Sequence, residues 1–352
     1  MRPTALSYPT GVSRPTIVVV IPTYNRRPLV LDALASVFAQ TRPADEVVVV
    51  DDGSTDGTAM AITSRFGEAV RVVTQPNAGV SVARDAGISA TRSEWIAFLD
   101  DDDVWLPHHL ATIHELAQRH PGAAVAVTQR NFRAGQEQPC QSTMDDISGS
   151  MLLGFDWLGD TSAVAVRRDA YVEAGGFDAG MRHGQDTDLF LRAAMTGPVA
   201  RVAATTMRRA RLGGGLSAQA ARHGLYLDAT RRTTANVIAL LDRTHHHDRS
   251  RLHSLALGRL ALAEALAAIS ADAPRRDVRA HLEDLLRHAA IFRQQPVIVL
   301  WRLARSAPQW DDRRWRARAL WNLLRAWPDK GHAGYARLCW WAARVTFPVR
   351  GR

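Results

Sequence analysis

The sequence predicts an α/β fold in which a mostly parallel central sheet is covered by helices on both faces, followed by an all-α C-terminal region. Apolar, β-branched runs recur through the first 130 residues, and they lack the polar alternation of a sheet with one solvated face. Windows with helical spacing separate these runs, as in repeated strand–helix units. From about residue 216 onward no convincing strand follows until the last residues. These three observations divide the chain into an α/β part and a helical part.

The expected strands and helices alternate in chain order. Strands are expected over residues 16–21, 46–50, 70–73, 95–99, 123–128 and 163–166. Helices are expected over residues 28–40, 58–66, 80–90, 108–119, 168–174 and 186–195. We expect Pro22 to end the first strand, and we expect irregular structure over residues 133–160.

An amphipathic stripe marks the helical part of the chain. Apolar residues recur at helical spacing from Val278 to Ala289, with charged residues on the opposite side. This pattern predicts an amphipathic helix.

The chain is expected to divide into three parts. Residues 1–15 have no apolar segment of the kind found in a signal peptide, and we expect them to be a flexible tail. Residues 16–210 are expected to form the α/β domain, and residues 211–352 a helical region.

The composition excludes several classes of protein. With 46% hydrophobic and 22% charged residues, the chain resembles globular proteins rather than disordered ones. The two cysteines exclude a disulfide scaffold and a cysteine-rich zinc module, and they suit a reducing cytosol. No apolar run reaches the roughly 18 residues of a membrane-spanning helix. A cytoplasmic globular protein is therefore expected.

The positive charge is concentrated at one end of the chain. Residues 301–352 contain eleven arginines, one lysine and three aspartates, which equals the net charge of +9 of the whole chain. They also contain seven of the ten tryptophans. No nucleic-acid-binding module accompanies this charge, so nucleic acid is not an expected partner. Peripheral contact with an anionic membrane at its inner face is one interpretation, and packing or partner binding within the helical region is the other.

Two polar clusters directly follow the first two expected strands, at the edge where such sheets bind ligands. Residues 22–26 read Pro-Thr-Tyr-Asn-Arg, and because this turn has no glycine it is neither a dinucleotide-binding turn nor a P-loop. Residues 51–56 read Asp-Asp-Gly-Ser-Thr-Asp, where an acidic side chain can accept a hydrogen bond from a ribose or a base. Capping of the next helix by Ser54, Thr55 or Asp56 is the alternative, and both can hold for different residues.

Four consecutive aspartates, residues 100–103, follow the fourth expected strand. A solvated acidic turn is one interpretation, but the strongly apolar flanks over residues 95–99 and 104–107 favour a site. Such a carboxylate group suits a hard divalent cation, which can hold a diphosphate.

Two more polar patches lie further along the chain. Residues 184–188 read Gly-Gln-Asp-Thr-Asp, and acidic residues in the first turn of a helix explain them without a functional role. Three consecutive histidines, residues 245–247, indicate a solvated loop rather than a metal site, because neighbours on a helix cannot all face one ion.

Five motifs in this order make the chain resemble family 2 glycosyltransferases of the GT-A fold. They are V-V-V-I-P-T-Y-N-R, V-V-V-V-D-D-G-S-T-D-G-T, N-A-G-V-S-V-A-R-D-A-G, I-A-F-L-D-D-D-D-V-W-L-P and G-G-F-D…G-Q-D-T-D-L-F-L-R, within residues 16–205. The resemblance implies inverting transfer of a sugar from a nucleotide-diphosphate donor, with Mg²⁺ or Mn²⁺, to a hydroxyl of a glycan or lipid-linked acceptor. UDP is the commonest donor nucleotide of the family.

The resemblance also implies roles for individual residues. The expected nucleotide contacts are Pro22, Thr23, Tyr24, Arg26, Asp52, Gly79, Arg84, Asp100 and Asp101, with Asp52 accepting a bond from the base and Asp101 near the ribose. Asp102 matches the metal ligand of the D-x-D motif, and Asp186 matches the catalytic base. Gln185 stands where the family usually has glutamate.

A catalytically degenerate member that binds nucleotide sugars or proteins without turnover is the competing hypothesis. The presence of Asp52, Asp102 and Asp186 favours an active transferase that builds a surface or secreted polysaccharide.

Overall fold

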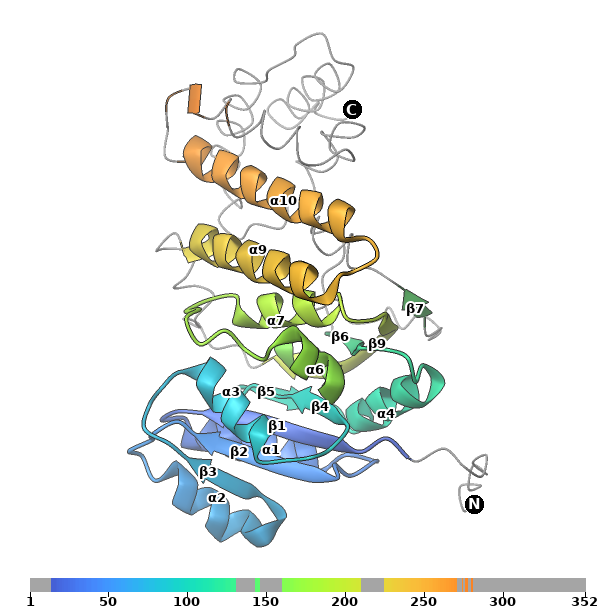
Figure 1. The fold of residues 1–352 in the computed structure, drawn as a ribbon. Coiled ribbons are helices and arrows are strands. Elements are labelled where there is room, and N and C mark those ends of the chain that lie inside the picture. Colours follow the sequence, from blue (N-terminus) through green and yellow to red (C-terminus); the bar gives the residue numbers. More distant parts are fainter. Residues whose placement is uncertain are drawn as a thin grey trace, which may run out of the picture. The chain divides into compact units, whose positions relative to one another are not determined.

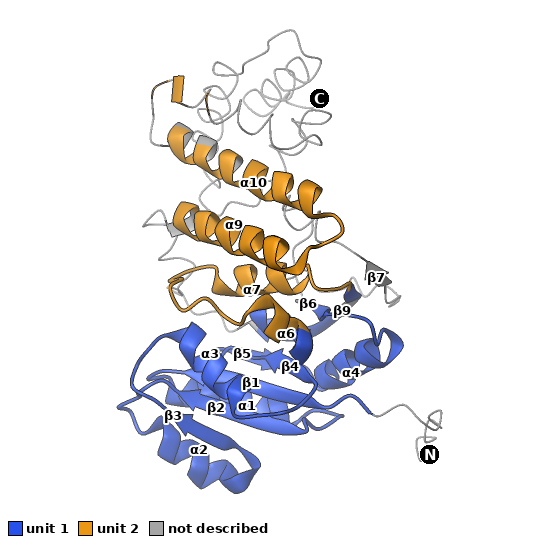
Figure 2. Ribbon diagram, viewed as in Figure 1, with its two compact units in different colours: residues 1–144, 159–169, 199–210 blue, residues 145–158, 170–198, 211–352 orange. Residues whose placement is uncertain are grey.

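A computed structural model describes residues 14–130, 143–145, 160–209 and 225–270, with positions 274, 276, 277 and 280 (Figure 1). The chain divides into two compact units that alternate along the sequence (Figure 2). Unit 1 comprises residues 1–144, 159–169 and 199–210, and unit 2 comprises residues 145–158, 170–198 and 211–352.

A mixed sheet forms the centre of unit 1. The strands are β1 (Ile17–Thr23), β2 (Glu46–Asp51), β3 (Arg71–Thr74), β4 (Trp95–Phe98), β5 (Asp103–Trp105), β6 (Val125–Arg130), β7 (Thr143–Asp145), β8 (Val164–Arg167) and β9 (Val199–Arg209). Their order is β3-β2-β1-β4-β8-β6-β9-β5, and β7 pairs with β9. The half from β3 to β4 is parallel, as expected. The other half is mixed, because β8 is antiparallel to both neighbours and β5 is antiparallel to β9.

Helices cover both faces of the sheet. They are α1 (Arg27–Phe38), α2 (Thr58–Phe66), α3 (Val80–Ser89) and α4 (His109–Arg119), with α4 on β6 and β9. Successive side chains of a strand point to opposite faces, and Ile17, Val19 and Ile21 of β1 share one buried cluster with side chains of α1, α2 and α4. The opposite face receives α3, where a Cβ on Gly87 would lie 2.7 Å from Val20.

Pro22 does not end β1, contrary to the sequence-based expectation, because the strand continues to Thr23. The carbonyl of Val20 accepts a hydrogen bond from the N–H of Leu99, so Val20 faces β4. Backbone groups alternate between the two neighbouring strands, and Pro22 therefore also faces the β4 side, beyond the end of β4 at Phe98. No ladder hydrogen bond is lost there, although proline has no N–H to donate.

Three strands were not expected from the sequence. β5 begins at the last of the four aspartates, β7 lies in a region expected to be irregular, and β9 reads V-A-R-V-A-A-T-T-M-R-R. Alanine and charged residues are poor strand formers, so β9 has a weak local signal. Pairing with β5, β6 and β7 stabilises it instead.

Helices make up the described part of unit 2. α6 (Arg168–Ala174) leads into it from unit 1, followed by α7 (Gln185–Ala193), α9 (Leu225–Thr244) and α10 (Arg249–Ser270). α9 packs against both α7 and α10, and it buries Val237, Leu240 and Leu241. The helix expected over residues 278–289 and the basic segment 301–352 lie outside the described residues. Among the helices that the structure describes, none is long and apolar enough to cross a membrane.

Candidate active site

The carboxyl ends of β1, β2 and β4 bring the three N-terminal polar clusters to one edge of the sheet in unit 1. β1 is registered with β2 from Val18 to Thr23, which places Thr23 beside Asp51. β4 runs parallel on the other side of β1 and leads into the acidic run at residues 100–103. The topology therefore assembles residues that are up to about 80 positions apart in the chain.

Asp101 is turned into the protein and joins two of these clusters. Its carboxylate accepts hydrogen bonds from Thr23 Oγ1 at 2.8 Å and from Arg26 Nη1 at 2.9 Å. Burial raises the pKa of Asp101 to about 6, although the positive charge of Arg26 and the hydroxyl of Thr23 act in the opposite direction. Both oxygens of Asp101 thus bind groups of the chain itself.

The other three aspartates of the run form a compact group. Asp100, Asp102 and Asp103 each offer a carboxylate oxygen, and these oxygens lie within 4.8 Å of one another. Hard divalent cations prefer oxygen ligands, so this group fits Mg²⁺ or Mn²⁺. The sequence pointed to Asp102 as the metal ligand and to Asp100 as a nucleotide contact, and it assigned no role to Asp103.

Two arginines and one serine hold this group. Arg84 Nη2 lies 2.7 Å from Asp100 Oδ1, and Arg26 Nη1 lies 3.5 Å from Asp102 Oδ2. The buried Ser162 hydroxyl donates to Asp103 Oδ2 at 2.6 Å and accepts from the N–H of Asp100 at 3.0 Å. Ser162 was not identified from the sequence, since it lies some 60 residues from the acidic run in no recognisable motif.

Asp52 anchors the loop that precedes α3. Its carboxylate accepts hydrogen bonds from Gln75 Nε2 at 2.7 Å and from the N–H groups of Ala78 and Gly79 at 2.9 Å. Gly79 is the N-cap residue directly before α3 and has a φ of +92°, a conformation that residues other than glycine rarely adopt. Asp52 thus fixes the loop, and Oδ2, with one hydrogen bond from Gly79, can accept one more.

The N-cap position of α2 is Gly57, so none of Ser54, Thr55 and Asp56 occupies it, but Asp56 lies directly before it and contacts the start of the helix. Asp56 accepts hydrogen bonds from the N–H of Thr58 at 3.1 Å and from the N–H of Arg27 at 3.0 Å, so it ties the starts of α2 and α1 together. Nearby, Asn25 Oδ1 accepts from the N–H of Thr55 at 2.7 Å. Tyr24, in the same turn, is 47% exposed.

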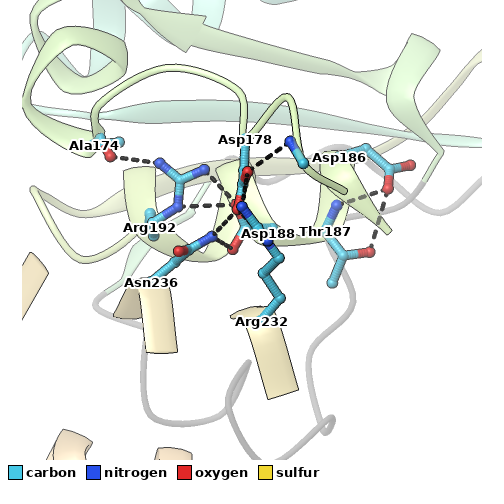
Figure 3. Close-up of polar contacts among 9 residues, drawn as sticks. Ala174, Asp178, Asp186, Thr187, Asp188, Arg192, Arg232 and Asn236 are labelled. Carbon is cyan, nitrogen blue, oxygen red and sulfur yellow. Dashed lines mark hydrogen bonds and ion pairs between the residues drawn. The ribbon is translucent and has the colours of Figure 1, made fainter. Parts of the chain in front are cut away.

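Unit 2 contains the remaining predicted residue, Asp186, in the first turn of α7 (Figure 3). Asp186 is half-buried, and its Oδ1 accepts a hydrogen bond from the N–H of Thr187 at 2.7 Å. Asp188 is fully buried and forms an ion pair with Arg192 of the same helix. Of the two aspartates, Asp188 is therefore a structural residue and Asp186 is the better candidate for chemistry.

Asp178, in the Gly-Gly-Phe-Asp segment, lies beside the same helix. Arg232 of α9 donates to both of its oxygens, at 2.5 and 2.9 Å, and Asn236 donates at 2.9 Å. These hydrogen bonds, that of Arg232 first, lower the pKa of Asp178 to about 2. Arg232 and Asn236 had no recognisable signal in the sequence, because nothing local links them to residues about 50 positions earlier.

Comparison with known proteins gives the family of the N-terminal part of the chain. Residues 18–171 match the family model described as Glycosyl transferase family 2. The chain therefore contains a glycosyltransferase family 2 domain. This domain includes the acidic run and both arginines that contact it, whereas Asp186 lies after the matched residues.

Curated relatives match between 29% and 49% of this chain. An uncharacterized glycosyltransferase of Nostoc sp. is 43% identical over 105 residues, 29% of this chain and 33% of the relative. The succinoglycan biosynthesis protein ExoW of Rhizobium meliloti is 40% identical over 109 residues, 29% of this chain and 34% of the relative. An uncharacterized glycosyltransferase of Haemophilus influenzae is 24% identical over 180 residues, 49% of this chain and 60% of the relative. The chain thus spans between one third and 60% of the length of these relatives.

Solved structures confirm the expected fold class. The structure of Staphylococcus aureus TarS 1–349 has a TM-score of 0.57 and 17% identity, covering 87% of this chain and 88% of that chain. The same TarS segment with UDP-GlcNAc has a TM-score of 0.52 and 16% identity, covering 79% and 92%. The glycosyltransferase domain therefore has the GT-A architecture, a mixed sheet with helices on both sides.

Proposed function

We propose that this protein is an inverting glycosyltransferase that moves a sugar from a nucleoside-diphosphate donor to a hydroxyl group of a glycan or lipid-linked acceptor. The observation that carries the proposal is the compact group of Asp100, Asp102 and Asp103 at the end of β4, with Arg84 and Arg26 beside it. The negative charge of a donor diphosphate must be balanced by positive charge. The three aspartates offer ligands for a divalent cation, and the two arginines beside them carry further positive charge.

A divalent cation, Mg²⁺ or Mn²⁺, when bound neutralises the charge that develops on the departing diphosphate. Asp102 is its principal proposed ligand, because its side chain is 21% exposed and lies beside Asp100 and Asp103. Asp103 is buried, and Ser162 orients its carboxylate. We therefore propose that Asp103 mainly keeps the three carboxylates in position.

The nucleoside is proposed to bind over the edge of the sheet between β1 and β2. Tyr24 offers an exposed ring for stacking on the base, and Oδ2 of Asp52 can accept one further hydrogen bond. Thr23 and Arg26 act mainly by holding Asp101 in place. UDP is the favoured nucleotide: it is the commonest in the family, and the TarS segment of the same fold was solved with UDP-GlcNAc.

Asp186 is the proposed catalytic base. It removes the proton from the acceptor hydroxyl as that oxygen attacks the anomeric carbon, and the nucleoside diphosphate leaves from the opposite side. One displacement of this kind inverts the anomeric configuration. The half-buried position of Asp186, beside the fully engaged Asp188, supports this role.

The acceptor is proposed to belong to a surface or secreted polysaccharide. Relatives of the domain are named for succinoglycan and teichuronic acid biosynthesis. The basic, tryptophan-rich segment 301–352 suits a cytoplasmic protein that contacts an anionic membrane at its inner face, where lipid-linked acceptors lie.

A screen of nucleotide sugars tests the proposal. The full chain is incubated with each donor, with and without Mn²⁺, and release of free nucleoside diphosphate is measured. We expect release with one donor class, dependent on Mn²⁺ and abolished by Asp102→Ala. The matched control is Asp32→Asn, an exposed aspartate on α1, which should retain activity. A degenerate protein would bind a donor without releasing nucleoside diphosphate.

A further inference from the structure

A single side-chain amide joins the two carboxylates on either side of Asp186. Asn236 Nδ2 donates to Asp178 Oδ2 at 2.9 Å and to Asp188 Oδ1 at 3.1 Å (Figure 3). An amide NH₂ group has two hydrogens, so both are used here. Because both partners are carboxylates, which only accept, the amide is oriented with its nitrogen toward them.

Each of these carboxylates is also held by an arginine. Asp188 is fully buried and pairs with Arg192, whose guanidinium also donates to the carbonyl oxygen of Ala174. Arg232 of α9 donates hydrogen bonds from Nε and Nη2 to the two carboxylate oxygens of Asp178. Each of the two carboxylates thus has an arginine partner, and Asn236 adds two further hydrogen-bond donors without adding charge.

This arrangement fixes both ends of the segment that carries Asp186. Asp178 precedes the segment, and Asp188 closes it within the first turn of α7. Asn236 and Arg232 lie one helical turn apart on α9, so one face of α9 holds both ends. Removing the amide would leave a buried carboxylate oxygen of Asp188 without this donor, a costly state that the segment can relieve only by moving.

We propose that Asn236 is a positioning residue for Asp186, and that α9, with Arg232, is thereby part of the catalytic apparatus. The inference rests on the proposed function of Asp186 as the base. It assigns a role to the helical part of the chain that follows the family 2 domain. The base must be oriented toward the acceptor hydroxyl, and a displacement of about 1 Å can lower the rate by up to about 10²-fold.

The test compares variants of the full chain, using donor hydrolysis or transfer with the donor that the screen identifies. Asn236→Leu keeps the approximate size but removes both donors, and we expect kcat to fall about 10- to 100-fold. The KM for the donor and its affinity should remain unchanged, because all the proposed donor contacts belong to unit 1. In an Asp186→Asn background the same substitution should cost no further activity, since Asn236 acts through Asp186.

Two neighbouring arginines give a second variant with a matched control. Arg231 and Arg232 are adjacent on α9, each side chain is 52% exposed, and each pairs with a carboxylate. Arg232→Leu removes the contact to Asp178 and should lower kcat without changing the KM. Arg231→Leu removes the contact to Glu264 of α10 and should leave kcat unchanged. Because both positions are exposed, these variants remain informative if Asn236→Leu does not fold.

The outcomes separate this inference from the proposed function. An inactive wild-type protein, or a fully active Asp186→Asn variant, contradicts the proposed function. An active wild type whose Asn236→Leu and Arg232→Leu variants match Arg231→Leu overturns the inference alone. A loss that is equally large in the Asp186→Asn background also overturns it, because Asn236 would then act on stability rather than through the base.

Discussion

Ser162 should control the affinity of the acidic group for a divalent cation, although it is not expected to touch the ion. Its hydroxyl donates to Asp103 Oδ2 at 2.6 Å and accepts from the N–H of Asp100 at 3.0 Å, so it holds two of the three proposed ligand residues. A hydrogen bond to a charged group contributes about 1.5–3 kcal/mol. Loss of an outer-shell partner typically weakens metal binding about 10- to 100-fold. We therefore expect Ser162→Ala to weaken Mn²⁺ binding by about this factor.

The assay is a Mn²⁺ titration followed by electron paramagnetic resonance, in which free Mn²⁺ gives the signal. Ser81 provides the matched control: it is also buried, and within the described residues its hydroxyl has no hydrogen-bond partner. Ser81→Ala should bind Mn²⁺ like the wild type. Equal Mn²⁺ affinity of Ser162→Ala and the wild type would refute the orienting role of Ser162.

Asp186→Asn should leave donor affinity nearly unchanged while the rate of sugar transfer falls by a factor of about 10²–10⁴. An equally large loss of donor affinity and of transfer would instead indicate that Asp186 has a structural role. Gly87→Ala should destabilise unit 1 by about 1–3 kcal/mol in urea unfolding, because its Cβ would lie 2.7 Å from Val20; an unchanged midpoint would contradict this packing. The pKa of Asp178 lies at about 2, below its ordinary 3.8, so its contribution to stability is present at neutral pH and lost as the pH falls through 2. The midpoint temperature of thermal unfolding should therefore change less between pH 6 and pH 2.5 in Asp178→Asn than in the wild type. Deleting residues 301–352 should abolish salt-sensitive sedimentation with anionic vesicles, whereas loss of helical circular dichroism without any vesicle binding by the intact chain would favour packing.

The parallel half of the sheet was predictable because its signals are local. The apolar runs of β1, β2 and β4 stand within a few residues of where they were expected, and each is followed by polar residues. Such runs show that a strand is buried, but they do not show its direction. The antiparallel β8 and the alanine-rich β9 depend on their neighbours in the sheet, so their pairing could not be deduced locally.

The acidic run shows the same limit at the level of single side chains. The sequence shows four consecutive aspartates, but it does not show which of their side chains turn inward. In the structure Asp101 faces Thr23 and Arg26, while Asp103 joins Asp100 and Asp102. This division depends on contacts with residues about 60 to 80 positions away. For the same reason Ser162 and Asn236, which hold candidate residues through long-range contacts, had no recognisable local signal.

The central claim is metal-assisted, inverting transfer of a sugar from a nucleoside diphosphate. Proton nuclear magnetic resonance of the reacting mixture tests it most directly, because the coupling constant of the anomeric proton reports configuration as the donor is consumed. We expect a product of inverted configuration to form together with one equivalent of nucleoside diphosphate, with Mn²⁺ present and the wild-type chain, and neither product with Asp102→Ala. A product of retained configuration, or equal turnover by the wild type and Asp102→Ala, would contradict the account.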